Sequence, residues 1–154
     1  METFNGQCAC GATKIQFQLP KADDIPKQAF CHCLFCKRST GACFTRNIVV
    51  PRSSITFPSE TPKVYYHQLS KPIGDGVPGL KWHFCSTCGV QLFSESAVLP
   101  GQAVVRVGVL DRQDEFREVR MQLFCKRANE WVKDAFESEQ GKFDEFPSKP
   151  SAEA

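Results

Sequence analysis

Seven cysteines of this chain fall into three tight clusters, and cysteines at such spacings are typical ligands of zinc. The clusters are Cys8-Ala-Cys10, Cys31-His-Cys33-Leu-Phe-Cys36 and Cys85-Ser-Thr-Cys88. Four thiolates can close one tetrahedral site, which leaves three thiolates for a second site with a vacant position. A zinc ion with a vacant position can bind and polarise an incoming ligand. The clusters therefore predict two zinc ions per chain, one in a closed site and one in an open site.

The spacing within each cluster indicates how the thiolates reach one ion. In the Cys-x-x-Cys cluster the chain must fold over the ion, and Gly89 directly follows it, as such turns often require. Side chains two apart on an extended segment share a face, so each Cys-x-Cys pair can also face one ion. Spacing alone leaves three pairings for the closed site, which are 8/10 with 85/88, 8/10 with 31/33, and 31/33 with 85/88.

The open site needs a fourth donor, which could be Cys43, Cys125, a histidine, water or substrate. We expect Cys43 and Cys125 to be small core residues instead, because free cysteine packs as a hydrophobe. A thioredoxin-like redox pair belongs at the start of a helix. The residues after Cys88 look like a strand, so a redox role is disfavoured.

Composition favours one globular domain in a reducing compartment. The chain has 154 residues, of which 42% are hydrophobic and 23% charged. Its nine cysteines are an odd number, so disulfides alone cannot pair all of them. The first residues lack the features of a signal peptide, and no apolar run is long enough to span a membrane. We therefore expect a cytoplasmic protein with no membrane partner.

The charge balance gives little reason to expect nucleic acid binding. The net charge is only +2, and the final 25 residues are acidic. We expect residues 1–146 to form a single domain and residues 147–154 to be a disordered tail, because that end is polar and contains two prolines.

Several short segments alternate apolar with polar or β-branched residues, which predicts a mainly β, antiparallel domain. The Val104–Val107 stretch is the least polar of them, so it should lie in a central strand. The expected strands are Lys14–Leu19, Thr45–Val50, Lys63–Leu69, Val90–Phe93, Gln102–Leu110 and Met121–Lys126.

Helical signal is sparse. We expect one helical turn over residues 34–40, ended by Gly41, and a short helix over Glu130–Glu137 capped by Asn129. The segment Lys71–Gly79 is rich in glycine and proline, so it should be a loop near the last cysteine cluster.

Three segments of this chain resemble motifs of the glutathione-dependent formaldehyde-activating enzyme family, which includes centromere protein V. The segments are Gly6-Gln-Cys-Ala-Cys-Gly11, Cys31-His-Cys-Leu-Phe-Cys-Lys-Arg-Ser-Thr-Gly41 and Phe84-Cys-Ser-Thr-Cys-Gly89. They occur in the family's order. Residues 121–132 match its last strand more loosely.

The resemblance implies a fold and a set of metal ligands. The fold is an Mss4-like tent of antiparallel strands with two zinc sites and one or two short helices. Carried over by position, the resemblance implies Cys8, Cys10, Cys85 and Cys88 for the structural zinc. It implies Cys31, Cys33 and Cys36 for the catalytic zinc. Cys43 departs from the family motif, which often has a small residue or proline there.

The resemblance also implies a reaction. The family joins formaldehyde to the thiol of glutathione, giving S-hydroxymethylglutathione, which is carbon–sulfur lyase chemistry in reverse. A relative acting on another thiol or carbonyl metabolite would share the same motifs. A protein-binding zinc module without catalysis is a further alternative, as is an Mss4-type scaffold with only the closed site.

Residues near the reactive cluster could complete a substrate pocket. Arg46 could bind a carboxylate of a peptide-like thiol, and Trp131 could form a wall of the pocket. His32 should point away from the cluster, because it alternates with two ligands on an extended segment, and should pack or hydrogen-bond behind it.

Overall fold

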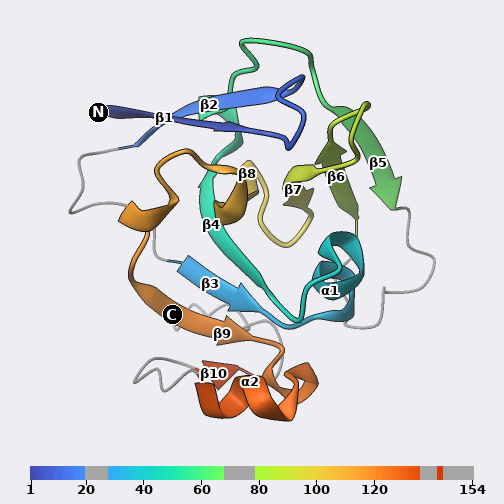
Figure 1. Ribbon diagram of the computed structural model, residues 1–154, viewed down its shortest axis with the longest axis vertical. Coiled ribbons are helices and arrows are strands. Elements are labelled where there is room, and N and C mark those ends of the chain that lie inside the picture. The colour runs from blue at the N-terminus through green and yellow to red at the C-terminus, as the bar shows by residue number, and fades with distance from the viewer. Residues whose placement is uncertain (20–27, 68–78, 136–141, 144–154) are drawn as a thin grey trace, which may run out of the picture.

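A mainly β architecture is found in the computed structural model, which describes residues 1–19, 28–67, 79–135 and 142–143 (Figure 1). Strands β1 and β2 form a two-stranded sheet, and the other strands form an eight-stranded sheet in the order β10-β9-β3-β4-β8-β7-β6-β5. The strands are β1 Glu2–Gln7, β2 Lys14–Leu19, β3 Gln28–Cys31, β4 Thr45–Pro51, β5 Lys63–His67, β6 Leu80–Phe84, β7 Gln91–Ser96, β8 Gln102–Arg106, β9 Val119–Leu123 and β10 Lys142–Phe143.

The helices of the described residues are short. They are α1 Leu34–Thr40 and α2 Glu130–Ala135, with 3₁₀ turns at Arg52–Ser54, Val107–Val109, Gln113–Glu115 and Cys125–Arg127. The predicted turn over residues 34–40 is confirmed, and Gly41 ends it with a φ of 68°. No helix in these ranges is long and apolar enough to cross a membrane.

The predicted mainly β fold is confirmed, with two differences. The large sheet is mixed, because β9 runs parallel to both β3 and β10. Strand β8 is central, as expected, but it ends at Arg106 because the next three residues turn into a 3₁₀ helix. Strand β9 likewise ends before Phe124, whose φ of 59° is left-handed.

Three predicted segments reach beyond the described residues. The strand over Lys63–Leu69 is seen as β5, and the helix over Glu130–Glu137 is seen as α2. The loop over Lys71–Gly79 and the tail over 147–154 lie outside the described ranges, except Gly79.

The large sheet has two different faces. One face packs against the β1–β2 hairpin, and the apolar side chains between them, such as Phe4, Ile48, Phe93 and Val105, are fully buried. Alternate residues of the same strands point to the opposite face, where α1 lies beside β4. The main hydrophobic core therefore lies on one side of the sheet.

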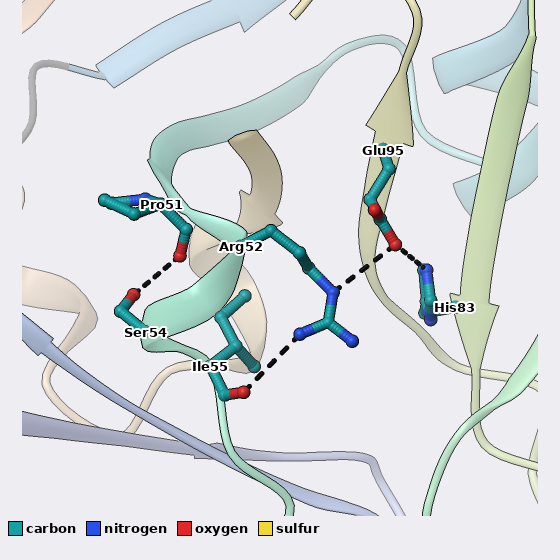
Figure 2. Close-up of polar contacts among 6 residues, drawn as sticks. All are labelled: Pro51, Arg52, Ser54, Ile55, His83 and Glu95. Carbon is teal, nitrogen blue, oxygen red and sulfur yellow. Dashed lines mark hydrogen bonds and ion pairs between the residues drawn. The ribbon is translucent and has the colours of Figure 1, made fainter. Parts of the chain in front are cut away.

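A polar contact ties the 3₁₀ turn after β4 to strands β7 and β6 on the core side of the sheet. Figure 2 shows Arg52 reaching Glu95 of β7, which also contacts His83 of β6. The Glu95 carboxylate oxygen Oε1 lies 2.6 Å from His83 Nε2 and 3.4 Å from Arg52 Nε. The His83 ring stacks on Phe93 with centroids 4.0 Å apart. Burial in this stack lowers the pKa of His83.

Helix α1 is joined to the segment before α2 by one side chain. Lys37 Nζ donates to the carbonyl of Arg127 and to Asn129 Oδ1, the latter at 2.7 Å. Asn129, the predicted cap of the second helix, accepts backbone N–H groups of α2 through its carbonyl. Its side chain instead contacts α1 through Lys37.

Candidate metal centres

The structure brings Cys8, Cys10, Cys85 and Cys88 together. Their Sγ atoms all lie within 4.8 Å of one another. Two turns present them: one connects β1 to β2, and the other connects β6 to β7. Of the three pairings that spacing left open, the structure therefore has 8/10 with 85/88.

The distances in this four-cysteine cluster fit one tetrahedral metal ion. Bonds of about 2.3 Å from zinc to sulfur place the sulfurs about 3.8 Å apart. The Sγ atoms of Cys8 and Cys10 are 3.5 Å apart, and those of Cys10 and Cys85 are 3.7 Å apart. A disulfide would require about 2.05 Å. The cluster therefore has the size of a metal site.

Backbone N–H groups also point at these sulfurs. Thr13 N donates to Cys8 Sγ at 3.3 Å, and Thr87 N donates to Cys85 Sγ at 3.4 Å. Backbone N–H groups of Val90 and Cys10 lower the pKa of Cys88. Gly89, at a φ of 74°, ends the second turn. Such donors stabilise thiolate, the form of cysteine that binds metal.

A second cluster is formed by Cys31, Cys33 and Cys36 on the other side of the sheet from the main core. Cys31 ends β3, Cys33 caps α1, and Cys36 lies in its first turn. Their Sγ atoms also lie within 4.8 Å of one another, and each residue is buried. In the described part of the chain, no other cysteine, histidine or carboxylate joins this group.

Cys43 and Cys125, two alternative fourth donors, lie outside both clusters. Cys125 Sγ contacts the carbonyl of Gln122 at 3.4 Å, and both cysteines are partly buried. All nine cysteines lie in the described ranges, and no disulfide joins any two of them.

The three-cysteine cluster favours negative charge at one sulfur. Hydrogen bonds from Cys31 and Cys33 hold the pKa of Cys36 well below its ordinary value, and the positive charge of Arg106 lowers it further. Another sulfur of the cluster accepts a backbone hydrogen bond: Cys36 N donates to Sγ of Cys33, the N-cap residue of α1, at 3.3 Å. The donor set is therefore suited to a soft divalent cation such as zinc.

A cavity of about 270 Å³ adjoins the three-cysteine cluster, on the face of the sheet away from the main core. Among the residues that the structure describes, most of its lining is apolar, and the polar side chains other than cysteine are Asn47, Ser94, Ser96 and Arg106. The remaining lining residues are Ala29, Cys31, Cys33, Phe35, Cys36, Val49, Leu80, Val98, Leu99, Val104, Met121, Leu123 and Phe124.

Arg106 supplies the positive charge of this cavity. It is 6% exposed, and its guanidinium donates to the side-chain oxygens of Gln91 at 3.1 Å and Asn47 at 2.5 Å. Within the described residues, no carboxylate forms an ion pair with Arg106. A buried cation needs a compensating charge. The sulfurs of Cys31, Cys33 and Cys36 line the same cavity, and the thiolate favoured at Cys36 can supply this charge.

The structure does not bring Arg46 and Trp131 into this cavity. Arg46 donates to Gln28 Oε1 at 2.9 Å and to the carbonyl of Phe116 at 3.1 Å. Trp131 is 63% exposed on α2. Neither residue lines the cavity.

His32 lies where alternation predicts. It is fully buried, and its Nε2 is 3.1 Å from Gln122 Oε1 on β9. This contact fixes the segment between two cysteines of the cluster.

Sequence reasoning missed Arg106, although a signal was present. The Val104–Val107 stretch was expected to be central, and an arginine inside such a strand must be buried. A buried charge next to a metal motif is a candidate for function. Alternation with Val105, which faces the core, would have placed Arg106 on the opposite face.

The family model described as glutathione-dependent formaldehyde-activating enzyme matches residues 3–127. Three chains of solved structures match. One is the crystal structure of a Rhodobacter sphaeroides protein, a structural genomics target, with 24% sequence identity and a TM-score of 0.53. That match covers 75% of this chain and 96% of the other, and it shows the fold alone. No curated protein matches.

Proposed function

The chain belongs to the glutathione-dependent formaldehyde-activating enzyme family, and we propose that it is an enzyme joining a thiol to an aldehyde at the three-cysteine cluster. The product is an S-hydroxyalkyl thiol adduct, such as S-hydroxymethylglutathione from glutathione and formaldehyde. The reverse reaction breaks the carbon–sulfur bond, so the enzyme belongs among the carbon–sulfur lyases.

One observation carries the proposal: three sulfurs, not four, line a cavity. Cys31, Cys33 and Cys36 leave one position of a tetrahedral ion for a substrate. The four-cysteine cluster instead supplies a full set of ligands and does not line the cavity. The two clusters therefore suit a catalytic zinc and a structural zinc.

Cys31, Cys33 and Cys36 would hold the catalytic zinc. When bound, zinc supplies a Lewis acid that lowers the pKa of a thiol and favours its thiolate. The three cysteines are buried, and most of the lining around them is apolar. The thiol substrate therefore meets the aldehyde in a site of restricted solvent access.

Arg106 would act on the aldehyde. As the substrate sulfur attacks the carbonyl carbon, a carbon–sulfur bond forms and the π electrons of the carbonyl move to oxygen. The oxygen then takes a proton from water, and the thiol proton is released to solvent. The Arg106 guanidinium, which lies in the same cavity, offsets the charge developing on that oxygen.

The thiol chemistry fits a reducing compartment such as the cytoplasm. Metal-binding thiols oxidise in disulfide-forming compartments, whereas reducing conditions keep them available.

The test removes one ligand of the three-cysteine cluster. Cys36→Ser should lose the catalysed exchange of formaldehyde with glutathione, followed by NMR above the uncatalysed rate. It should keep the fold and about one zinc per chain, against about two in the wild type. Cys43→Ser, which alters a cysteine outside both clusters, is the matched control. Full activity of the Cys36 variant would overturn the proposal.

A further inference from the structure

The cavity beside the three-cysteine cluster is larger than formaldehyde needs. Its volume of about 270 Å³ is several times the roughly 30 Å³ that one water molecule takes up in the liquid. Formaldehyde has only two non-hydrogen atoms and would fill a small part of this space. The remaining volume is available to a substituent on the aldehyde.

The lining also disfavours the charged groups of glutathione. Glutathione carries two carboxylates and an ammonium group, whereas the described residues that line the cavity include one cation and no carboxylate. That cation, Arg106, already donates to Gln91 and Asn47. The peptide part of such a thiol therefore belongs outside the cavity, where its charges stay hydrated.

The cavity has a charged end at Arg106 and a mostly apolar stretch along β4 and β8, where Ser94 pairs with Val104 and adds a hydroxyl group. Arg106 and Asn47 come from neighbouring positions of β8 and β4, as their pairing in the sheet shows. Two residues further along the same strands, Val104 and Val49 pair and present apolar side chains to the cavity. Val98 and Leu99 add to the apolar part. A ligand that fits has an oxygen at one end and hydrocarbon at the other.

We infer that the cavity binds an aldehyde with an aliphatic substituent, with its carbonyl oxygen toward Arg106 and its hydrocarbon chain along Val49 and Val104. This inference rests on the proposed function and names its carbonyl substrate. The bond changes are those given above: sulfur adds to the carbonyl carbon, and the oxygen takes a proton from water. Formaldehyde is then a small substrate that leaves most of the cavity unused.

Binding of unreactive amides to the zinc-loaded full chain tests the inference without turnover. Acetamide, butanamide and hexanamide carry the same carbonyl oxygen with hydrocarbon chains of increasing length. Each added methylene that leaves water should tighten binding roughly fourfold, as measured by calorimetry. Affinity that does not change with chain length would overturn the inference.

Substitutions of the lining residues test whether the gain in affinity with chain length arises in this cavity. Val104→Phe fills part of the cavity and should abolish the gain from chain length. Val49→Phe, at a position 38% exposed, should do the same and is a second variant should the first not fold. Val64→Phe is the matched control, because Val64 is 52% exposed on β5 and does not line the cavity. An unchanged chain-length gain in both cavity variants would refute this site.

Turnover of long and short aldehydes with glutathione tests this inference and the proposed function separately. If hexanal reacts with glutathione at a higher kcat/KM than formaldehyde, both hold. If formaldehyde is turned over but longer aldehydes are not, the inference fails and the proposed function stands. If no aldehyde is turned over but the amides bind with the expected chain-length gain, the proposed function fails and the cavity remains a site for aliphatic carbonyl compounds.

Discussion

Removing two exposed ligands of the four-cysteine cluster should destabilise the whole domain. Cys10 and Cys88 are exposed, so Cys10→Ser with Cys88→Ser removes little packing. The two remaining cysteines, Cys8 and Cys85, cannot complete a tetrahedral site. The loss of stability therefore reports metal binding rather than core packing.

The structure sets the size of this loss. The metal would link chain positions such as Cys10 and Cys85, which are 75 residues apart. Treated as a covalent cross-link, a loop of that length contributes about 4.5 kcal/mol by restricting the unfolded chain. Folding stabilities are on the order of 5–15 kcal/mol, so this link alone is a large share. The three-cysteine cluster spans only residues 31–36, and the same relation gives about 2 kcal/mol.

Urea unfolding of zinc-loaded protein, followed by circular dichroism, measures the effect. With a slope of about 2 kcal/mol per molar urea, the double variant should unfold about 2 M earlier or fail to fold. Cys43→Ser with Cys125→Ser removes two thiols outside both clusters and is the matched control. An unfolding midpoint equal to that of the control would refute a structural metal that joins the two sheets.

Three further predictions follow from individual contacts. Gly6→Ala should destabilise the domain by about 1–3 kcal/mol in urea unfolding, because a Cβ there would lie 2.7 Å from the carbonyl oxygen of Val109. Lys37→Met should speed hydrogen exchange in α2 by removing the bond to the Arg127 carbonyl, without loss of zinc; unchanged exchange would contradict this. Burial lowers the pKa of His83, so the unfolded state binds more protons and stability falls as pH drops below about 6.5. His83→Gln should show a smaller fall between pH 7.5 and 5.5, and an equal fall would count against buried neutral histidine.

Alternation predicted β2 with its full length but missed β1, which also has one face on the core, because Phe4 is the one large apolar residue in β1. Residues 14–19 alternate between core and surface, and β2 has the predicted bounds. All four residues of β3 are buried, so the strand gives no period of two to find. In β8, apolar sequence continues past the end of the strand, because the backbone turns while the side chain of Val107 stays buried.

The metal ligands could be predicted because each cluster is local in sequence. Their pairing could not be derived from spacing, since 75 residues separate Cys10 from Cys85 and only the folded sheets bring them together. The resemblance to known motifs supplied the pairing that the structure has. Arg46 was considered for its nearness in sequence to the reactive cluster, but alternation along β4 places it on the face opposite Asn47, away from the cavity.

The two cysteine clusters differ in how far apart their members lie in the sequence, and this difference bears on when each cluster could bind a metal during synthesis. All three members of the three-cysteine cluster, here the trio, lie within residues 31–36 and are therefore synthesised early. The four-cysteine cluster is complete only after residue 88 has been synthesised, because Cys85 and Cys88 supply two of its four thiols. A metal bound by the trio could therefore be acquired before one bound by the four-cysteine cluster.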